Sequence, residues 1–317
     1  MPFVQNRRQF LQTSLAATAS LAFSRTLLAQ AEAAPQDPVA AMRAAAASVK
    51  ITTQPLRRNL SLLMGSGGNI VVLPGKDGKL VVDAGFATSR PQITEALAAL
   101  SADPLGHLVD THWHFDHTDG NEWMHAAGAK IVAHENTLKR LSTNQEIAAF
   151  HATFPPAPVG ARPTITFAQD HKLRVNSHSL ELSHYAAAHT DTDISVHFVE
   201  ADVLHVGDTW FNGNYPFIDY SSGGNIDGMI AATQRNLART STTTMIVPGH
   251  GPLGHRAELE EYGTMLSTIR ANVAKLKKAG RTLPETIAAN PTASFDAKYG
   301  SGLINAPTFT TLVYLGV

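Results

Sequence analysis

The 317-residue sequence contains no cysteine. Disulfide bonds, thiolate metal ligands, iron–sulfur clusters and a cysteine nucleophile are therefore excluded. An excess of charge of one sign is also lacking, because 25 basic and 26 acidic side chains leave a formal net charge of -1. A protein that binds nucleic acid mainly through phosphate contacts is usually far more basic. We therefore expect no nucleic-acid partner.

Long apolar runs are absent as well. No segment reaches about 18 consecutive apolar residues, whereas a membrane-spanning helix needs about 20, so we expect no stable membrane span. The motif G-x-S-x-G of many serine hydrolases is also missing. With 44% hydrophobic and 16% charged residues, the composition is that of a globular protein with one large domain or two small ones.

The first 31 residues have the pattern of an export signal. Arg7 and Arg8 form a positive start, a weakly apolar stretch follows over residues 11–23, and residues 29–31 offer an A-x-A cleavage site. The segment 6–12 (NRRQFLQ) resembles the twin-arginine export signal of bacteria. This resemblance implies a periplasmic or secreted protein. The alternative is an N-terminal amphipathic helix with two solvated arginines.

The rest of the chain alternates expected strands and helices. Residues 32–56 are expected to be a loose lead-in, rich in alanine at its start, to one domain over residues 57–317. We expect strands at residues 60–64, 69–73, 79–82, 107–110, 129–133, 164–167, 179–184, 194–199, 203–206, 244–247 and 310–315, and helices at 88–100, 121–127, 135–150, 227–239 and 258–279. This α/β pattern favours two sheets with helices on their outer faces.

Four potential metal ligands lie within six residues, namely His112, His114, Asp116 and His117. On an extended backbone, positions i and i+2 point the same way, so His112 and His114 can hold one ion together. Asp116 and His117 then belong to a turn and can face a second ion. Burying three imidazoles and a carboxylate so close together is costly without a cation between them. The alternative is a purely structural polar loop.

The stretch 112–117 resembles the H-x-H-x-D-H signature of the metallo-β-lactamase superfamily. That family has three later ligands, and this sequence offers His189, Asp208 and His250, each just after an expected strand. The resemblance covers about residues 60–254 and implies an α/β fold built as a four-layer αββα sandwich. It also implies that a first metal is held by His112, His114 and His189, a second by Asp116, His117 and His250, and that Asp208 bridges the two.

The same resemblance implies a chemistry. Imidazole and carboxylate ligands without a thiolate suit two zinc ions, and iron or manganese are the alternatives. Such an enzyme would use a metal-bridging hydroxide to cleave a carbonyl C–N, C–O or C–S bond in a small-molecule lactam, lactone, ester or thioester. Asp116 would have the catalytic role of orienting that hydroxide. Asp83 and Thr190 would support the ligand loops by hydrogen bonds.

Two departures leave the subfamily open. Residues 189–194 (HTDTDI) resemble a stretch of β-lactamases that place a cysteine on the second metal, yet cysteine is missing here. Residues 207–209 (GDT) resemble the glyoxalase II and lactonase branch instead. A periplasmic β-lactamase proper and an iron-dependent redox enzyme therefore remain alternatives. Five aromatic residues could line a substrate pocket or belong to the core: Trp210, Phe211, Tyr215, Phe217 and Tyr220.

Overall fold

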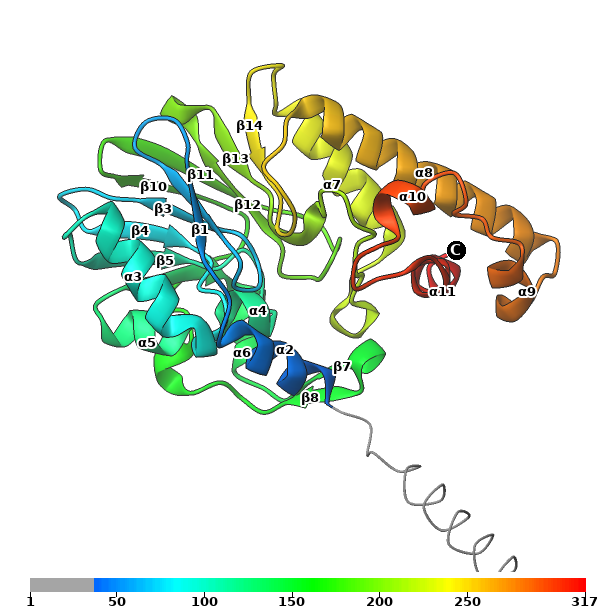
Figure 1. Ribbon diagram of the computed structural model, residues 1–317, viewed down its shortest axis with the longest axis horizontal. Coiled ribbons are helices and arrows are strands. Elements are labelled where there is room, and N and C mark those ends of the chain that lie inside the picture. The colour runs from blue at the N-terminus through cyan, green and yellow to red at the C-terminus, as the bar shows by residue number, and fades with distance from the viewer. Residues whose placement is uncertain (1–36) are drawn as a thin grey trace, which may run out of the picture.

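Two β-sheets form the centre of the computed structural model, which describes residues 37–317 (Figure 1). The expected signal segment, residues 1–31, lies outside the described residues. In sheet order, the first sheet contains β1 (Thr52–Pro55), β2 (Ser61–Met64), β3 (Ile70–Leu73), β4 (Lys79–Val82), β5 (Leu105–Val109), β6 (Lys130–His134) and β9 (Ile165–Phe167). The second contains β10 (Asp170–Val175), β11 (His178–His184), β12 (Ile194–Phe198), β13 (Val203–His205) and β14 (Met245–Val247).

Strand β3 illustrates why the two sheets stack. Its four residues are all buried, and they alternate between two apolar layers. Val71 and Leu73 belong to the core between the sheets, together with Leu182 of β11. Ile70 and Val72 belong to a second core on the outer face. A strand that is buried on both faces has a continuous apolar sequence, as this one does.

Helices cover the outer face of each sheet. On the first sheet, α3 (Arg90–Leu100) and α5 (Asn121–Ala126) supply Ile93 and Met124 to the outer core. On the second, the covering helices are α7 (Ile226–Ala238) and α8 (Arg256–Lys278), and α11 (Ala306–Leu315) packs against α8. The predicted four-layer αββα sandwich is therefore confirmed.

The remaining elements connect these layers. They are α2 (Pro38–Ala46), α4 (Phe115–Thr118), α6 (Glu135–Leu141), α9 (Leu283–Ala288), α10 (Asp296–Tyr299), the hairpin of β7 (Gln145–Ile147) and β8 (Ala152–Phe154), and the short 3-10 turns η1 (Ala87–Ser89), η2 (Ala148–Phe150), η3 (Val159–Ala161), η4 (Val199–Ala201), η5 (Gly207–Thr209) and η6 (Tyr220–Ser222). Within residues 37–317, no helix is both long and apolar enough to cross a bilayer.

The last strand expected from the sequence, at residues 310–315, is wrong, because this segment forms α11. The β-branched residues favoured a strand, but the start of the segment carries helix signals. The side chain of Asn305 accepts a hydrogen bond from the Thr308 amide, and Pro307 lies in the first turn. Phe309, Leu312 and Val313 then share one buried face at helical spacing.

Two further segments differ from the expectation. The supposed loose lead-in contains α2, which Asp37 caps by accepting from the amides of residues 39 and 40, and the edge strand β1, which pairs with β2. The helix expected over residues 135–150 ends at Leu141, and the β7–β8 hairpin follows. Short-range sequence patterns do not predict α2 or the hairpin, because both are held by contacts with distant parts of the chain.

Candidate metal centre

The seven candidate ligands lie in loops that follow strands of both sheets. His112 and His114 follow β5, and Asp116 and His117 lie in α4 directly after them. The later three are His189 between β11 and β12, Asp208 in η5 after β13, and His250 after β14. Binding residues are often carried on loops, and here the loops bring together side chains as far apart in the sequence as His112 and His250.

The structure brings all seven side chains into one cluster. Ligand atoms lie within 4.8 Å of one another in three groups: His112, His114 and His189; His112, His117 and Asp208; and Asp116, His117 and His250. The first and third groups are the two triads that the family resemblance implies.

Asp208 lies between the two triads. Its Oδ1 is 3.2 Å from His117 Nε2, and its Oδ2 is 3.4 Å from the Nε2 atoms of both His189 and His250. The Nε2 of His112 is 3.9 Å from the same Oδ2. One carboxylate thus approaches imidazoles from both triads, which is the placement that a bridging ligand needs.

Buried polar atoms in the cluster lack partners. His112 is fully buried, and its Nε2 forms no hydrogen bond with any described residue. Such an atom normally has a partner, because leaving it unpaired is costly. The Nδ1 of His114 and the Nε2 of His189 approach each other at 2.9 Å in the same triad. These nitrogen atoms converge where a cation would satisfy all three rings.

Electrostatics distinguish two pairs of histidines in the cluster. Burial and the neighbouring imidazoles hold the pKa of His112 well below its usual value, and burial lowers the pKa of His189 to about 4. For His117 and His250, burial opposes the charged form, but nearby carboxylates outweigh it. Asp208 and Asp116 raise the pKa of His117 well above its usual value and that of His250 to about 10. The two carboxylates therefore favour the protonated form of both rings.

Asp83 supports the ligand loop from behind. Its Oδ2 accepts hydrogen bonds from His117 Nδ1 at 2.7 Å and from the Thr111 hydroxyl at 2.8 Å, while its Oδ1 accepts from the Thr111 amide. Asp83 is fully buried and has a left-handed φ of 64°. The bond to Nδ1 leaves Nε2 of His117 as the atom that faces the cluster, which is how carboxylates orient metal-binding imidazoles.

Thr190 supports the loop of His189 through a neighbouring carboxylate. Its hydroxyl donates to Asp193 Oδ1 at 2.6 Å, and the amides of His189 and Thr190 donate to Asp193 Oδ2. The ring of His189 is fixed separately, because its Nδ1 lies 2.8 Å from the carbonyl oxygen of Phe217. Both contacts direct Nε2 of His189 into the cluster.

Asp219 is a functional candidate that the sequence analysis missed. Its Oδ2 lies 3.0 Å from His114 Nε2, so Nδ1 is the atom of His114 that faces the cluster. The carboxylate also accepts from the Ser222 hydroxyl and the Ser221 amide. Burial opposes its charge, but the bond to His114 lowers its pKa to about 2. No motif in the sequence marks Asp219, which lies 105 residues after His114.

Two glycines give the ligands the space they need. A Cβ on Gly249 would lie 1.9 Å from Asp208 Oδ1, and one on Gly68 would lie 2.1 Å from the ring of His117. Both distances are far below van der Waals contact, so any larger residue would displace a ligand.

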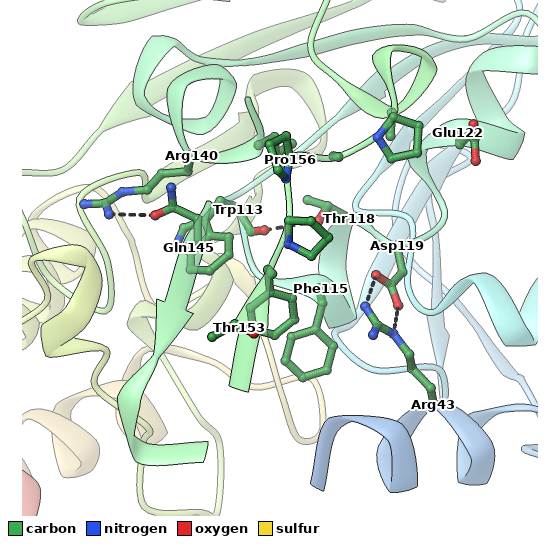
Figure 2. Close-up of a pocket in the computed structure, with 16 residues that line it drawn as sticks. Arg43, Trp113, Phe115, Thr118, Asp119, Glu122, Arg140, Gln145, Thr153 and Pro156 are labelled. Carbon is green, nitrogen blue, oxygen red and sulfur yellow. Dashed lines mark hydrogen bonds and ion pairs between the residues drawn. The ribbon is translucent and has the colours of Figure 1, made fainter. Parts of the chain in front are cut away.

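An apolar pocket opens beside the cluster. Three of the five aromatic residues singled out in the sequence, Phe211, Tyr215 and Phe217, line it together with His114, Asp116, His189, Asp208 and His250. Trp210 instead belongs to the core, and Tyr220 lines a separate hollow beside α11. Trp113 and Phe115 alternate with the ligands and line a neighbouring pocket, which is shown in Figure 2, and Phe115 lines the apolar pocket as well.

The comparison with protein families is decisive. The profile described as "Metallo-beta-lactamase superfamily" matches residues 63–250, which include all seven candidate ligands. The chain belongs to the metallo-β-lactamase superfamily. Membership in this superfamily of metal-dependent hydrolases confirms the family that the H-x-H-x-D-H stretch indicated.

Individual relatives are more distant. A hydroxyacylglutathione hydrolase of Polaromonas sp. (strain JS666 / ATCC BAA-500) is 28% identical over 183 residues. The match covers 52% of this chain and 60% of that protein, so the chain spans less than two thirds of the relative's length.

Solved structures share the fold. A metallo-β-lactamase from Pontibacter korlensis has a TM-score of 0.55 at 20% identity and covers 69% of this chain and 99% of its own. The sec-alkylsulfatase Pisa1 from Pseudomonas sp. has a TM-score of 0.63 at 16% identity, with 84% of this chain and 50% of that chain covered.

Proposed function

We propose that this chain is a dinuclear zinc-dependent hydrolase that cleaves a carbonyl C–N, C–O or C–S bond in a small molecule. The observation that carries the proposal is the convergence of seven side chains with nitrogen or oxygen donors into one cluster, with His112 Nε2 left without a hydrogen bond from any described residue. Metal ions can bind all the donor atoms of such a buried cluster at once. Protons cannot do so, because several protonated imidazoles at these distances would repel one another.

The residues fit a metal pair in number and type. His112, His114 and His189 would hold one ion, Asp116, His117 and His250 the other, and Asp208 would contact both. Neutral imidazoles and carboxylates suit zinc, and the same donors accept iron or manganese. When bound, such a pair supplies a Lewis acid for a carbonyl oxygen and lowers the pKa of water toward 7.

Asp116 is the candidate catalytic residue of the chain. It lines the pocket, and its Oδ2 lies 3.2 Å from His250 Nε2. Burial raises its pKa, but His117 and His250 outweigh burial and bring the pKa to about 2. The carboxylate is therefore ionised at neutral pH. It can accept a hydrogen bond from an attacking water and orient that water toward the carbonyl carbon.

The protein is proposed to act outside the cytoplasm. Support for this comes from the twin arginines and the A-x-A site in residues 1–31. Replacing both Arg7 and Arg8 with lysine should leave the full-length precursor in the cytoplasm. Fractionation that finds the double variant exported as well as the unchanged chain would contradict the twin-arginine route.

The test of the proposed function is a hydrolysis panel on the purified chain with and without zinc. The panel contains a chromogenic cephalosporin, an acyl-homoserine lactone, a thioester and a phosphodiester. His114→Ala should lose bound metal and activity together, whereas His171→Ala on the edge strand β10 should lose neither. Full hydrolysis by metal-free protein would contradict the proposal. Bound iron with oxygen-dependent turnover would indicate the redox alternative instead.

A further inference from the structure

The pocket beside the metal centre has apolar walls. It has a volume of about 230 Å³, and five of the seven candidate ligands form its base. Seven apolar side chains form the walls: Met42, Phe115, Phe150, Phe211, Phe217, Leu303 and Ile304. A water molecule occupies about 30 Å³ in the liquid, so the pocket has room for about eight groups of that size.

These walls come from segments that are far apart in the sequence. Met42 belongs to α2, and Phe150 belongs to η2 in the β7–β8 hairpin, which lies beside α2 (Figure 1). The ring of Phe150 stacks on Phe217 with centroids 4.8 Å apart. Leu303 precedes α11 and is 68% exposed, so it forms the rim. An exposed leucine beside a catalytic cluster is well placed to meet an apolar ligand.

No lysine or arginine is among the fourteen described residues that line this pocket. The polar groups other than the ligands are the amide of Asn214 and the Tyr215 hydroxyl, which donates to Asp296 Oδ1 at 2.8 Å. Both are uncharged. The walls therefore offer no positive charge to a substrate beyond what the metal centre supplies at the base.

Two arginines line the neighbouring pocket instead, and carboxylates hold both of them. Arg43 binds Asp119 through Nε at 2.6 Å and Nη2 at 2.8 Å, as Figure 2 shows. Arg140 binds Asp191 through two nitrogens at 3.0 and 2.7 Å. Turning either guanidinium toward the apolar pocket would break a bidentate ion pair.

These observations bear on the charge of the substrate. A carboxylate placed among the rings of Phe150 and Phe217 would lose its hydration and gain no cation in return. β-Lactam antibiotics carry such a carboxylate next to the lactam ring, and glutathione thioesters carry two. An uncharged apolar group, in contrast, would bury its surface at no such cost.

We propose that the substrate is a neutral ester, lactone or thioester whose apolar acyl group, of about six to eight carbons, fills this pocket. The inference rests on the hydrolytic function proposed above. In the reaction, water gives its hydroxyl group to the acyl carbon, the bond from that carbon to oxygen or sulfur breaks, and a proton passes to the leaving alcohol or thiol. The products are a carboxylic acid and that alcohol or thiol, which stay joined as one hydroxy acid when the substrate is a lactone.

The activity test uses p-nitrophenyl esters of straight-chain acids with two to ten carbons. We expect kcat/KM to rise by about fourfold for each added methylene that the pocket buries, up to six to eight carbons. The matched pair is the hexanoate ester and the mono-ester of adipic acid, which has the same length but ends in a carboxylate. We expect the hexanoate to be preferred by at least about tenfold.

A matched pair of variants tests whether the lack of a positive charge in the pocket walls disfavours a carboxylate on the substrate. Leu303→Lys places an ammonium at the rim and should raise hydrolysis of the adipate mono-ester relative to the hexanoate by about tenfold. Leu315→Lys makes the same change at an exposed position of α11 outside this pocket and should leave the ratio unchanged.

Calorimetric binding separates this inference from the proposed function. The uncharged ligand hexanamide should bind the purified chain, whereas adipamate, its counterpart with a terminal carboxylate, should bind at least about tenfold more weakly. Binding of hexanamide without hydrolysis of any ester would overturn the hydrolase and leave the pocket assignment standing. Equal or better binding and hydrolysis of the carboxylate-bearing compounds would overturn the pocket assignment and leave the hydrolase standing.

Discussion

Removing the carboxylate of Asp219 should weaken metal binding although this residue is not a candidate ligand. Its Oδ2 lies 3.0 Å from His114 Nε2, and its side chain is 1% exposed. A hydrogen bond to a charged group contributes about 1.5–3 kcal/mol. Loss of a carboxylate that orients a metal-binding histidine lowers metal affinity by about 10- to 100-fold, which is about 1.4–2.8 kcal/mol. The two ranges agree, so we expect Asp219→Ala to fall within them.

The assay is zinc competition with a chromophoric chelator at pH 7.5. Asp219→Asn keeps an oxygen acceptor for His114 and should recover part of the affinity. Asp227→Ala removes an exposed aspartate that pairs with Arg270 on the protein surface, and it serves as the control. Thermal unfolding of the metal-free proteins reports any general loss of structure. Wild-type zinc affinity in Asp219→Ala would refute the idea that Asp219 positions His114.

Three further predictions follow from the structure. Gly249→Ala should abolish binding of at least one zinc ion, because the new Cβ would lie 1.9 Å from Asp208 Oδ1; Gly160→Ala, whose nearest contact is 3.7 Å, should retain both ions in metal analysis. Zinc binding at pH 7.5 should release protons, because the pKa of His250 is raised to about 10 and a ligand must be deprotonated. The apparent zinc affinity should then rise as the pH is raised from 6 toward 9, and calorimetry in buffers of different ionisation enthalpy would contradict this by finding no proton release. Leu182→Ala, in the core between the sheets, should lower the free energy of unfolding by about 2–5 kcal/mol in urea titrations, and a loss below about 1 kcal/mol would mean that this core is not tightly packed.

The layered fold could be predicted because its signals are local. The apolar strand 70–73 and the helical spacing of Leu259, Tyr262, Leu266 and Ile269 each point to one structure over a short window. Four of the candidate ligands could also be predicted from local sequence, because they lie within six residues, whereas His189, Asp208 and His250 were assigned through the family resemblance. The strand predicted for residues 310–315 was wrong because the structure of this segment is not determined by a local signal. Its β-branched composition favours a strand, and the cap and buried face that make it α11 depend on neighbours and packing.

The support of the site could be predicted only in part. Asp83 and Thr190 lie in stretches that the family signature covers, and the structure gives both the hydrogen bonds expected of them. Asp219 lies 105 residues from His114, with no motif around it, so its contact exists only in the folded chain. The pocket walls could not be predicted either, since Met42 and Leu303 line one pocket only after α2 and the segment before α11 have docked in the folded chain.

Anomalous diffraction at the zinc edge from crystals of the zinc-loaded chain tests the central claim most directly. The account predicts two peaks per molecule, one among His112, His114 and His189 and the other among Asp116, His117 and His250, with the Asp208 carboxylate between them. A map with no peak in this cluster, or with its strong peaks elsewhere on the protein, would contradict the account.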